Sequence, residues 1–399
     1  MSTDIDMERY AYLKNGDVVR QVAELEQLKW RVPEGGPNAF IADFLDSVKD
    51  DDVLLLSSDR RNAISYTGRI QAISYNAIPW NDVGLLKPLQ RFSVFLRTIF
   101  KLLQFHPTRI ICGRTGSMLW ASYLVSKIYR VPLVHSRHNR LIEEHEKRLY
   151  RRIGYFLDIW VITRIHGSVC HGPYLRQQLI DAGVDEGRVF EFDSGNRDFY
   201  EHALTASCSE QVRTGKEEFI VLFVGRMEKN KGIVDLFNAC KNIGKKYQQL
   251  RLVYVGDGEA SSLLEGLVEA SSLQERVKLL GRIEHEQLGS LMQQCDLLVT
   301  PTWSSFPEGR CMTAMEGLVM GIPVVAPDFG PFPYLVEHNI NGLLYAPDSV
   351  KDLESSILKC VANSELYTKL KAGAQISGQA LLDAPTVFSS AVSNAFAEK

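Results

Sequence analysis

Residues 296–327 read DLLVTPTWSSFPEGRCMTAMEGLVMGIPVVAP, and this stretch decides the fold. The apolar run LLVT predicts a strand, PTWSSFPEGR a loop and CMTAMEGLVM a helix. Gly321 follows that helix and Pro323 comes soon after, which is a common stop signal before the second apolar strand. This order of strand, loop, helix and strand predicts a βαβ unit in a parallel sheet.

The same alternation runs along the whole chain. Apolar runs rich in Val, Ile and Leu, without polar alternation, predict strands that are buried on both faces. These runs are Val53–Ser57, Arg109–Cys112, Pro132–Val134, Phe219–Val224, Leu252–Val255, Leu297–Thr300 and Pro323–Ala326. Helical patterns lie between them, for example Ile233–Lys241 and Gln287–Gln294.

A chain of 399 residues predicts two domains of roughly 200 residues each. We place the boundary in the polar stretch 202–217, which gives an N-terminal domain 1–210 and a C-terminal domain 211–382. A helix within 383–399 can pack back on the first domain. The expected fold is α/β, with two doubly wound, Rossmann-like domains facing a central cleft, where such sheets bind ligands.

Composition excludes several classes of protein. The net charge of −3 argues against a dedicated nucleic-acid binder. Seven scattered cysteines without a CxxC pair predict neither a disulfide framework nor a zinc site. The polar N-terminus is unlike a secretory signal, and no apolar run is long enough to span a bilayer. We therefore expect a cytoplasmic protein, with Asp50–Asp52 as a solvated turn rather than a metal site.

Two glutamates frame the predicted helix entrance. Glu308 lies in the loop, and Glu316 lies one to two turns inside the helix. A helix N-terminus suits a diphosphate, and a helical carboxylate can accept hydrogen bonds from both hydroxyls of a ribose. Gly309 would let the backbone approach such a ligand closely. The alternative is a solvated loop residue and a surface charge on a helix.

This stretch resembles glycosyltransferase family 4, whose members have the GT-B fold and a Glu-x7-Glu motif in the C-terminal domain. Glu308 and Glu316 match that motif. The similar segments are FIVLFVGRMEKNKGIVDLFNAC (219–240), LVYVGDGE (252–259), VKLLGRIEHEQLGSLMQQCDLLVTP (277–301), GIPVVAP (321–327) and NGLLYAPDS (341–349), the last resembling a closing hairpin. The resemblance implies a retaining transferase with a UDP- or GDP-sugar donor and no metal or other cofactor.

The resemblance also assigns roles to residues of the C-terminal half. Arg226 and Lys231 would contact the donor phosphates and stabilise the leaving diphosphate, as fixed cations do; two solvated cations are the alternative. The remaining candidate donor contacts are Gly225 in the Gly-Arg turn, Arg282 and Ile283 near the base, and Gly309, Arg310, Cys311 and Met312 at the helix entrance.

One departure from the family is local. Where the family often has Phe-Gly after the first glutamate and its glycine, this chain has Arg310-Cys311. The hypothesis is that Arg310 touches the phosphate or an acidic group of a substrate. Unchanged donor and acceptor kinetics in an Arg310→Ala variant would refute it.

The N-terminal half resembles the family less closely. Within the similar segment 106–140, His138 matches a histidine placed near the reacting sugar, although a core histidine is the alternative and His135 is a weaker candidate. In PEGGPNAF (33–40), Gly35 and Gly36 would approach the donor phosphate or the acceptor, unless they form an ordinary turn.

The first strand of this half is a problem for the resemblance. YAYL (10–13) is the only short candidate, and residues 17–31 look helical or irregular. The first sheet is therefore either decorated or missing its first strand.

Charge is uneven in the N-terminal half. Residues 60–152 hold 17 Lys and Arg against four Asp and Glu. The segment LQRFSVFLRTIFKLLQF (89–105) is a basic amphipathic helix, which can lie on an anionic membrane surface. It can equally be a core helix with a solvated basic face, and the charge could steer an anionic acceptor.

The reading that follows is transfer of a sugar from a nucleoside diphosphate to an acceptor hydroxyl on a glycan, a lipid-linked intermediate or a small molecule. The two-carboxylate scheme of glycosidases is not expected for Glu308 and Glu316. Two rivals remain: a sugar-nucleotide epimerase of similar layout, and a non-catalytic protein that binds sugar nucleotides or glycans.

Overall fold

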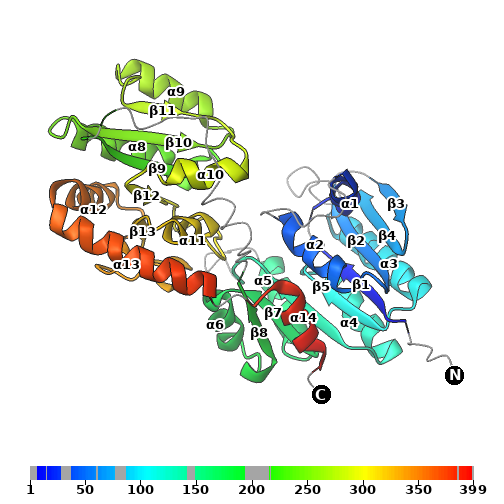
Figure 1. Cartoon of the computed structure of the whole chain (residues 1–399). Helices are drawn as coiled ribbons and strands as arrows, with labels where there is room; N and C mark the ends of the chain where they lie inside the picture. The colour runs from blue at the N-terminus through cyan, green and yellow to red at the C-terminus, as the bar shows by residue number, and fades with distance from the viewer. Residues whose placement is uncertain are drawn as a thin grey trace. The chain divides into compact units, whose positions relative to one another are not determined.

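The structure is a computed structural model, and it describes residues 7–14, 16–27, 37–59, 62–76, 87–141, 149–193, 215, 217–383 and 386–397. The chain forms two compact units (Figure 1). The N-terminal unit takes in Met1–Ser194 and Thr386–Lys399, and the C-terminal unit takes in Gly195–Pro385. Nearly all of the boundary expected at 202–217 lies outside the described residues.

The N-terminal unit is built on an eight-stranded sheet of order β3-β4-β2-β1-β5-β6-β7-β8, in which only the β3–β4 pair is antiparallel. Its strands are β1 (Arg9–Leu13), β2 (Asp52–Asp59), β3 (Ala63–Thr67), β4 (Ile70–Asn76), β5 (Arg109–Cys112), β6 (Leu133–Arg137), β7 (Gly167–His171) and β8 (Val189–Phe192). Its helices are α1 (Val18–Gln27), α2 (Pro37–Ser47), α3 (Lys87–Phe105), α4 (Ser117–Tyr129), α5 (Leu149–Ile162), α6 (Pro173–Asp181), the 3-10 helix η1 (Glu186–Arg188) and α14 (Phe388–Ala397).

The doubtful first strand is present and central. β1 pairs in parallel with β2 on one side and with β5 on the other. Tyr10 and Tyr12 enter the cluster under α1, α2 and α14, while Ala11 and Leu13 enter the cluster under α3, α4 and α5. Both faces are therefore buried, as the apolar YAYL run requires. The sheet is decorated by α1 and by the β3–β4 hairpin rather than missing a strand.

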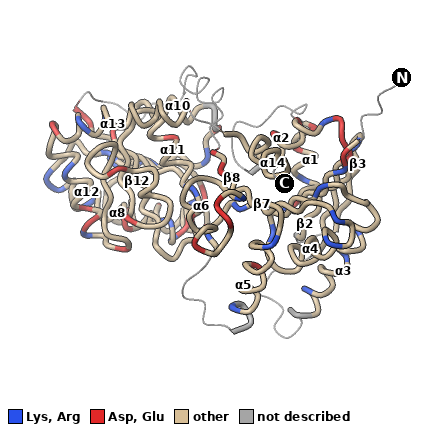
Figure 2. The backbone as a smooth tube through the Cα atoms, turned by 90° about the horizontal axis from the view of Figure 1, so that it is seen from below, with Lys and Arg blue, Asp and Glu red and all other residues tan. Residues whose placement is uncertain are grey.

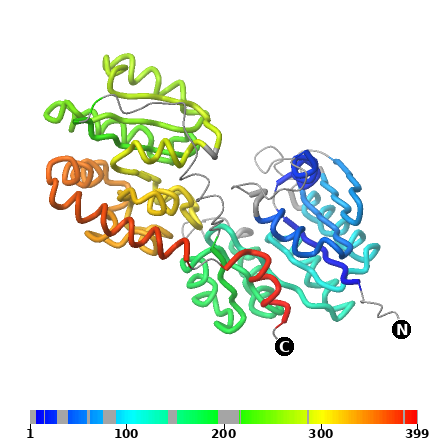
Figure 3. The backbone as a smooth tube through the Cα atoms, viewed as in Figure 1, coloured from blue at the N-terminus to red at the C-terminus, as the bar shows by residue number. Residues whose placement is uncertain are grey.

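The last helix belongs to the first sheet. Ser389 donates from its backbone N–H and its hydroxyl to the carboxylate of Asp43 on α2, at 2.7 and 2.9 Å. Phe388, Val392 and Phe396 are buried in the same cluster as α2. Figure 3 shows this return, with the red last helix beside the green segment of the N-terminal unit.

The C-terminal unit is built on a six-stranded parallel sheet of order β11-β10-β9-β12-β13-β14. Its strands are β9 (Phe219–Val224), β10 (Leu250–Val255), β11 (Val277–Leu279), β12 (Leu297–Val299), β13 (Val324–Pro327) and β14 (Gly342–Tyr345). Its helices are α8 (Ile233–Gly244), α9 (Ser261–Ala270), α10 (His285–Met292), α11 (Met312–Val319), α12 (Val350–Ala362) and α13 (Ser364–Asp383), with the 3-10 helices η2 (Lys229–Lys231) and η3 (Phe332–Tyr334).

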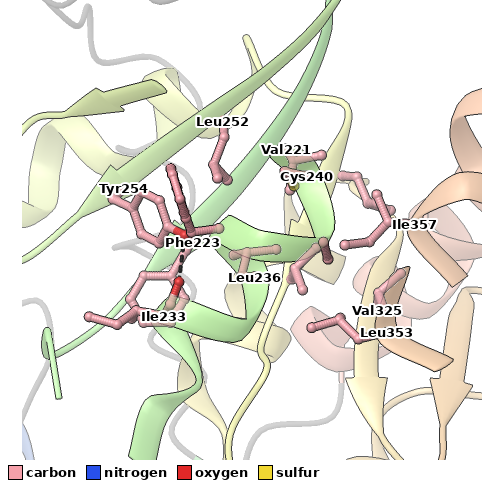
Figure 4. Packing of buried hydrophobic residues seen from close by; sticks show 14 of the residues in the cluster. Val221, Phe223, Ile233, Leu236, Cys240, Leu252, Tyr254, Val325, Leu353 and Ile357 are labelled. Carbon is pink, nitrogen blue, oxygen red and sulfur yellow. Dashed lines mark hydrogen bonds between the residues drawn. The ribbon is translucent and has the colours of Figure 1, made fainter. Parts of the chain in front are cut away.

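Helices cover both faces of this second sheet. α8, α9 and α12 pack on one face and α10, α11 and α13 on the other. Figure 4 shows the first of these cores, where the hydroxyl of Tyr254 donates to the carbonyl oxygen of Ile233 at 2.8 Å. That bond satisfies a fully buried polar group, which would otherwise destabilise the fold.

The expected closing hairpin is wrong. β14 pairs in parallel with β13, with Val324 opposite Gly342 and Pro327 opposite Tyr345. The edge strand lies so close that a Cβ on Gly342 would be 2.1 Å from the carbonyl oxygen of Val324. The NGLLY segment therefore ends the sheet as a sixth parallel strand.

Candidate active site

The C-terminal sheet has a topological switch point between β9 and β12. The chain runs from β9 outward through β10 to β11, and then returns to the other side of β9 at β12. Ligands of such sheets bind outside the carboxyl ends of the strands at this point. The loop after β9 carries Arg226 and Lys231, and the loop after β12 carries Glu308. Residues expected to share a function therefore come from the two strands that flank the switch point.

An ion pair joins the two loops. Nζ of Lys231 lies 2.6 Å from Oε2 of Glu308, and the two side chains are 15% and 14% exposed. The ammonium also lies 3.8 Å from the centre of the Phe306 ring. A partly buried charge pair with an aromatic neighbour is held in place more firmly than a surface pair. The structure thus brings Lys231 and Glu308, two separately predicted site residues, into direct contact.

Backbone contacts hold these loops together. Gly232, which follows Lys231 and begins α8, has φ +70°, and a Cβ there would lie 1.9 Å from the carbonyl oxygen of Pro301. The backbone N–H of Trp303 donates to the carbonyl of Asn230 at 2.9 Å, and its indole N–H donates to Asp235 at 2.6 Å. Lys231 and Glu308 are therefore presented by one tied pair of loops.

Arg226 projects more than its neighbours. Its side chain is 62% exposed, its Nη1 atom contacts Oε1 of Glu228, and its Cζ atom lies 5.5 Å from the centre of the Phe306 ring. The cations of Arg226 and Lys231 thus both lie near the ring of Phe306. This places two cations at one edge of the sheet, where an anion can reach at least the exposed guanidinium.

The glycines of this edge allow close packing of the loops. A Cβ on Gly256, after β10, would lie 1.9 Å from the carbonyl oxygen of Gly225, and Gly256 has φ +128°. The N–H of Gly256 also donates to the carbonyl of Gly281 at 2.7 Å. Arg282 and Ile283 follow directly, the first exposed and the second half-buried. The structure therefore brings these predicted base contacts to the same edge as Gly225.

Glu316 lies inside the unit. It occupies the second turn of α11 and is 8% exposed, and burial raises the pKa of its carboxyl to about 7. The alternative of a surface charge therefore does not hold, because Glu316 is a buried carboxyl whose pKa lies near neutral pH. Perturbed carboxyls of this kind mark functional sites more often than ordinary ones.

The residues around the α11 entrance are also buried. Gly309, Arg310 and Cys311 are buried and Met312 is half-buried. Burial, followed by the charge of Glu308, raises the pKa of the Cys311 thiol to about 12, so this thiol is neutral. Nη2 of Arg310 lies 3.8 Å from Sδ of Met315. The structure places Arg310 against the core, and its contact with a substrate stays a prediction.

His138 lies in the N-terminal unit, just past β6. Its Nε2 atom is 2.9 Å from the hydroxyl of Ser136, and its ring is packed among Phe40, Phe192 and Phe388. Burial, then the charges of nearby Lys14 and Arg137, lowers its pKa to about 4. The imidazole is therefore neutral at pH 7 and can donate or accept a hydrogen bond.

The structure places none of the other N-terminal candidates, His135, Gly35 and Gly36, at a described site. His135 is fully buried within β6, and burial lowers its pKa to about 3, so it is a core residue of the sheet. Gly35 and Gly36 lie outside the described residues. In the described part of the chain, no group of three or more His, Cys, Asp or Glu side chains could hold a metal ion.

Sequence reasoning did not single out Phe306, Trp303 or Lys14. The two aromatic residues stand in the quoted loop before Glu308, where their proximity to the glutamate was a usable signal. Lys14 directly follows the YAYL run, and a lysine at the end of a buried strand was a second signal.

Solved structures identify the fold. HepE of Anabaena, solved in complex with UDP, superposes with a TM-score of 0.67 at 18% identity over 98% of this chain and 100% of that one. Sucrose-phosphate synthase from Thermosynechococcus elongatus gives 0.67 at 19% identity over 94% of this chain and 95% of that one. The two parallel-sheet α/β units thus define a protein of the GT-B class, as predicted.

Sequence comparison identifies the family. Residues 41–190 match the sequence model "Glycosyltransferase Family 4", and residues 208–376 match "Glycosyl transferases group 1". The chain therefore belongs to glycosyltransferase family 4 and is a glycosyltransferase of the group 1 type.

Curated relatives are transferases of varied substrates. The alpha-D-kanosaminyltransferase of Streptomyces kanamyceticus is 25% identical over 65% of this chain and 69% of its own length. An uncharacterized glycosyltransferase of Methanocaldococcus jannaschii is 34% identical over 53% and 54%. The alpha-monoglucosyldiacylglycerol synthase of Acholeplasma laidlawii is 26% identical over 45% of each chain. The matches thus span about half the length of the last two relatives.

Proposed function

We propose that this protein transfers a hexose or related sugar from a nucleoside-diphosphate donor to an acceptor hydroxyl, with retention of anomeric configuration. The observation that carries the proposal is the Lys231–Glu308 pair at the switch point of the C-terminal sheet. A cation and a carboxylate within hydrogen-bonding distance can serve the two charges that separate during transfer. Negative charge develops on the leaving diphosphate and positive charge on the sugar.

Four charged residues of the donor site have a proposed task. Lys231 and Arg226 bind the diphosphate and stabilise it as it leaves, and Glu316 binds the ribose hydroxyls. Glu308 positions the sugar and offsets its oxocarbenium-like charge. The diphosphate also meets the N-terminus of α11, where backbone N–H groups lack helical partners. Because two side-chain cations supply the positive charge, we propose that no metal or other cofactor takes part.

Glu308 is not the proposed nucleophile. A carboxylate held 2.6 Å from an ammonium has its negative charge engaged in an ion pair, which makes it a poorer nucleophile than an unpaired carboxylate. In the proposed transfer the diphosphate departs and the acceptor hydroxyl attacks from the same face of the sugar. The departing phosphate oxygen takes the proton of that hydroxyl. UDP and UDP-glucose bound to HepE are consistent with a donor of this chemical class.

The N-terminal unit is proposed to bind the acceptor. His138 would contact the reacting sugar or its acceptor as a neutral imidazole. The acceptor class is a glycan, a lipid-linked intermediate or a small molecule, in glycan, polysaccharide or glycolipid synthesis. The named relatives include an alpha-D-kanosaminyltransferase and, by its name, a synthase of a glucosylated diacylglycerol.

A membrane-facing role for the N-terminal unit rests on its outer helices. On α3, Val94, Thr98 and Leu102 face the core. The opposite face of the same helix exposes Leu89, Phe92, Leu96 and Phe100. α5 similarly exposes Ile153, Phe156, Leu157 and Trp160. Both helices contribute buried residues to the same cluster under one face of the sheet.

Basic residues accompany this apolar face. Arg97 and Lys101 lie on α3, Arg152 lies on α5, and Figure 2 marks Lys and Arg positions in blue along these helices. Exposed apolar side chains with basic neighbours suit the surface of an anionic membrane. We propose a cytoplasmic enzyme that is peripheral on the inner face of the membrane. None of the described helices is both long and apolar enough to cross a bilayer.

A thermal-shift panel of nucleotide sugars tests the proposed donor. A ligand present at a hundred times its dissociation constant adds about 2.7 kcal/mol to the free energy of unfolding. No stabilisation by any UDP-, GDP- or ADP-sugar would refute the proposal. A transferase should hydrolyse its donor slowly and lose this activity in Glu308→Ala or Lys231→Ala, whereas a non-catalytic binder should not hydrolyse it at all. If no epimerised donor forms, the protein is not an epimerase.

A further inference from the structure

Lys14 occupies the switch point of the other sheet. It directly follows β1, and its backbone N–H extends the strand by donating to the carbonyl of Leu56 at 3.0 Å. β1 lies between β2 and β5, and the chain continues first to β2 and later to β5 on the opposite side. The carboxyl ends of β1 and β5 therefore flank the place where a doubly wound sheet binds its ligand.

The side chain of Lys14 is largely buried, and no described residue supplies a counter-charge to its ammonium. The residue is 7% exposed, and within the described ranges its Nζ atom makes no hydrogen bond and no ion pair. Burial lowers the pKa of the ammonium to about 8, and no carboxylate acts against that shift. A buried charge of this kind is costly, so an anion that reaches it is bound with a gain in stability.

The surroundings of Lys14 are cationic. Its charge and that of Arg137 both lower the pKa of His138. Arg114, two residues past β5, donates from Nη2 to the hydroxyl of Ser58 at 2.8 Å, so a second cation stands at the end of the neighbouring strand.

The strand ends leave little side-chain bulk at this place. Gly113 follows β5, and its N–H donates to the carbonyl of Leu13 at 2.7 Å. A Cβ on Gly113 would lie 3.4 Å from that same oxygen and 3.7 Å from the carbonyl oxygen of Ser136. The loop after β5 therefore approaches the ends of β1 and β6 with backbone alone.

We propose that Lys14 binds an anionic group, a phosphate or a carboxylate, carried by the acceptor. This inference rests on the proposed function and specifies its acceptor. The donor diphosphate already has two assigned cations, Arg226 and Lys231, in the C-terminal unit. Residues 60–152 hold 17 basic and only four acidic residues. This positive charge would attract an anionic acceptor.

Inorganic phosphate is the probe, used with the full-length protein. To weaken phosphate binding at the donor site, phosphate is titrated in a Lys231→Met background, with thermal unfolding as the readout. We expect stabilisation by phosphate, weakened about tenfold or more by Lys14→Met and unchanged by Lys49→Met. Lys49 is an exposed lysine in the turn that follows α2 and serves as the control. Equal phosphate stabilisation with and without Lys14 would overturn the proposal.

A second arm separates donor from acceptor. With Lys231 intact, a nucleotide sugar should stabilise wild type and Lys14→Met equally. Loss of that stabilisation in Lys14→Met alone would assign the anion to the donor and overturn the acceptor assignment. If no nucleotide sugar stabilises the wild type, the proposed function is contradicted. The phosphate titration still tests whether Lys14 binds an anion.

A measurement on wild type covers the case in which Lys14→Met does not fold. Reductive methylation followed by mass spectrometry reports the accessibility of each lysine amine. Phosphate should reduce labelling of Lys14 and leave that of Lys49 unchanged. Equal labelling of Lys14 with and without phosphate would contradict the proposal.

Discussion

The ammonium of Lys231 lies 2.6 Å from the carboxylate of Glu308, although 77 positions separate the two residues in the chain. Their contact joins the loop after β9 to the loop after β12 at the switch point of the C-terminal sheet. In the proposed reaction this pair provides the opposite charges that the departing diphosphate and the sugar require.

Lys231→Met should reduce kcat by about 10²- to 10³-fold, as loss of one fixed transition-state contact does in other enzymes. The fold should survive, although the variant leaves the largely buried carboxylate of Glu308 unpaired and should therefore lower the stability of the C-terminal unit. Steady-state kinetics and thermal unfolding check both statements. Lys229→Met, an exposed lysine of the same 3-10 turn, is the control and should retain kcat within about twofold. An equal loss in both variants would argue for a general charge effect.

Gly232→Ala should destabilise the C-terminal unit by about 2–4 kcal/mol, because φ is +70° and the added Cβ meets the carbonyl oxygen of Pro301 at 1.9 Å. Urea unfolding measures the change. Gly266→Ala is the control, since Gly266 lies in α9 with no atom within 4 Å of its Cβ position. That variant should gain up to about 1 kcal/mol. Similar losses in both would refute the close contact.

Glu316 should make stability depend on pH. Its folded pKa of about 7 exceeds the ordinary 4.5, so the folded state retains a proton that the unfolded state has lost between these values. Stability therefore falls as pH rises from about 4.5 to 7, by about 3 kcal/mol at most, and is then level. Glu316→Gln should remove this fall, which urea unfolding at several pH values would reveal. Parallel wild-type and variant profiles would contradict the shifted pKa.

The same carboxyl should couple donor binding to pH. Ribose hydroxyls donate to the ionised form, so affinity for a nucleotide sugar should rise as pH increases through about 7. Calorimetry in buffers of different ionisation enthalpy would show proton release on binding. Binding without proton release would remove Glu316 from the ribose. A nucleotide sugar is the right ligand, because its diphosphate carries no group that titrates in this range.

Vesicles of anionic lipid should bind the wild type. They should bind a Phe100→Glu, Phe156→Glu double variant about tenfold more weakly, because both exposed rings are lost from the apolar face. Co-sedimentation measures this. Ile376→Glu is the control, since Ile376 is as exposed but lies on α13 of the C-terminal unit. Binding that does not depend on anionic lipid, or is lost equally in the control, would dismiss the membrane surface.

Much of the fold was predictable because the strands of a parallel sheet are continuous apolar runs. The runs at β5 and β9 match the strands residue for residue. The helix stop at Gly321 also follows, since this residue has φ +71° and its N–H donates to the carbonyl of Leu318. In contrast, β3 lies at the edge of its sheet and alternates between half-buried and exposed residues, so an apolar run does not mark it.

The site was predictable only in part. The residue types and their order placed Arg226, Lys231 and Glu308 at strand ends, but the ion pair itself depends on β9 and β12 being neighbours. The burial of Glu316 depends likewise on how α11 packs on its sheet. Lys14 was passed over because its significance comes from burial without a partner, which no local pattern reveals.

The most direct test of the central claim is release of a nucleoside diphosphate from a panel of nucleotide sugars, measured for wild type, Lys231→Met, Glu308→Gln and Lys229→Met. We expect release from at least one donor by wild type and by Lys229→Met, and a loss of about 10²-fold or more in the other two variants. Undiminished release by Lys231→Met and Glu308→Gln, or no release from any donor by wild type, would contradict the central claim.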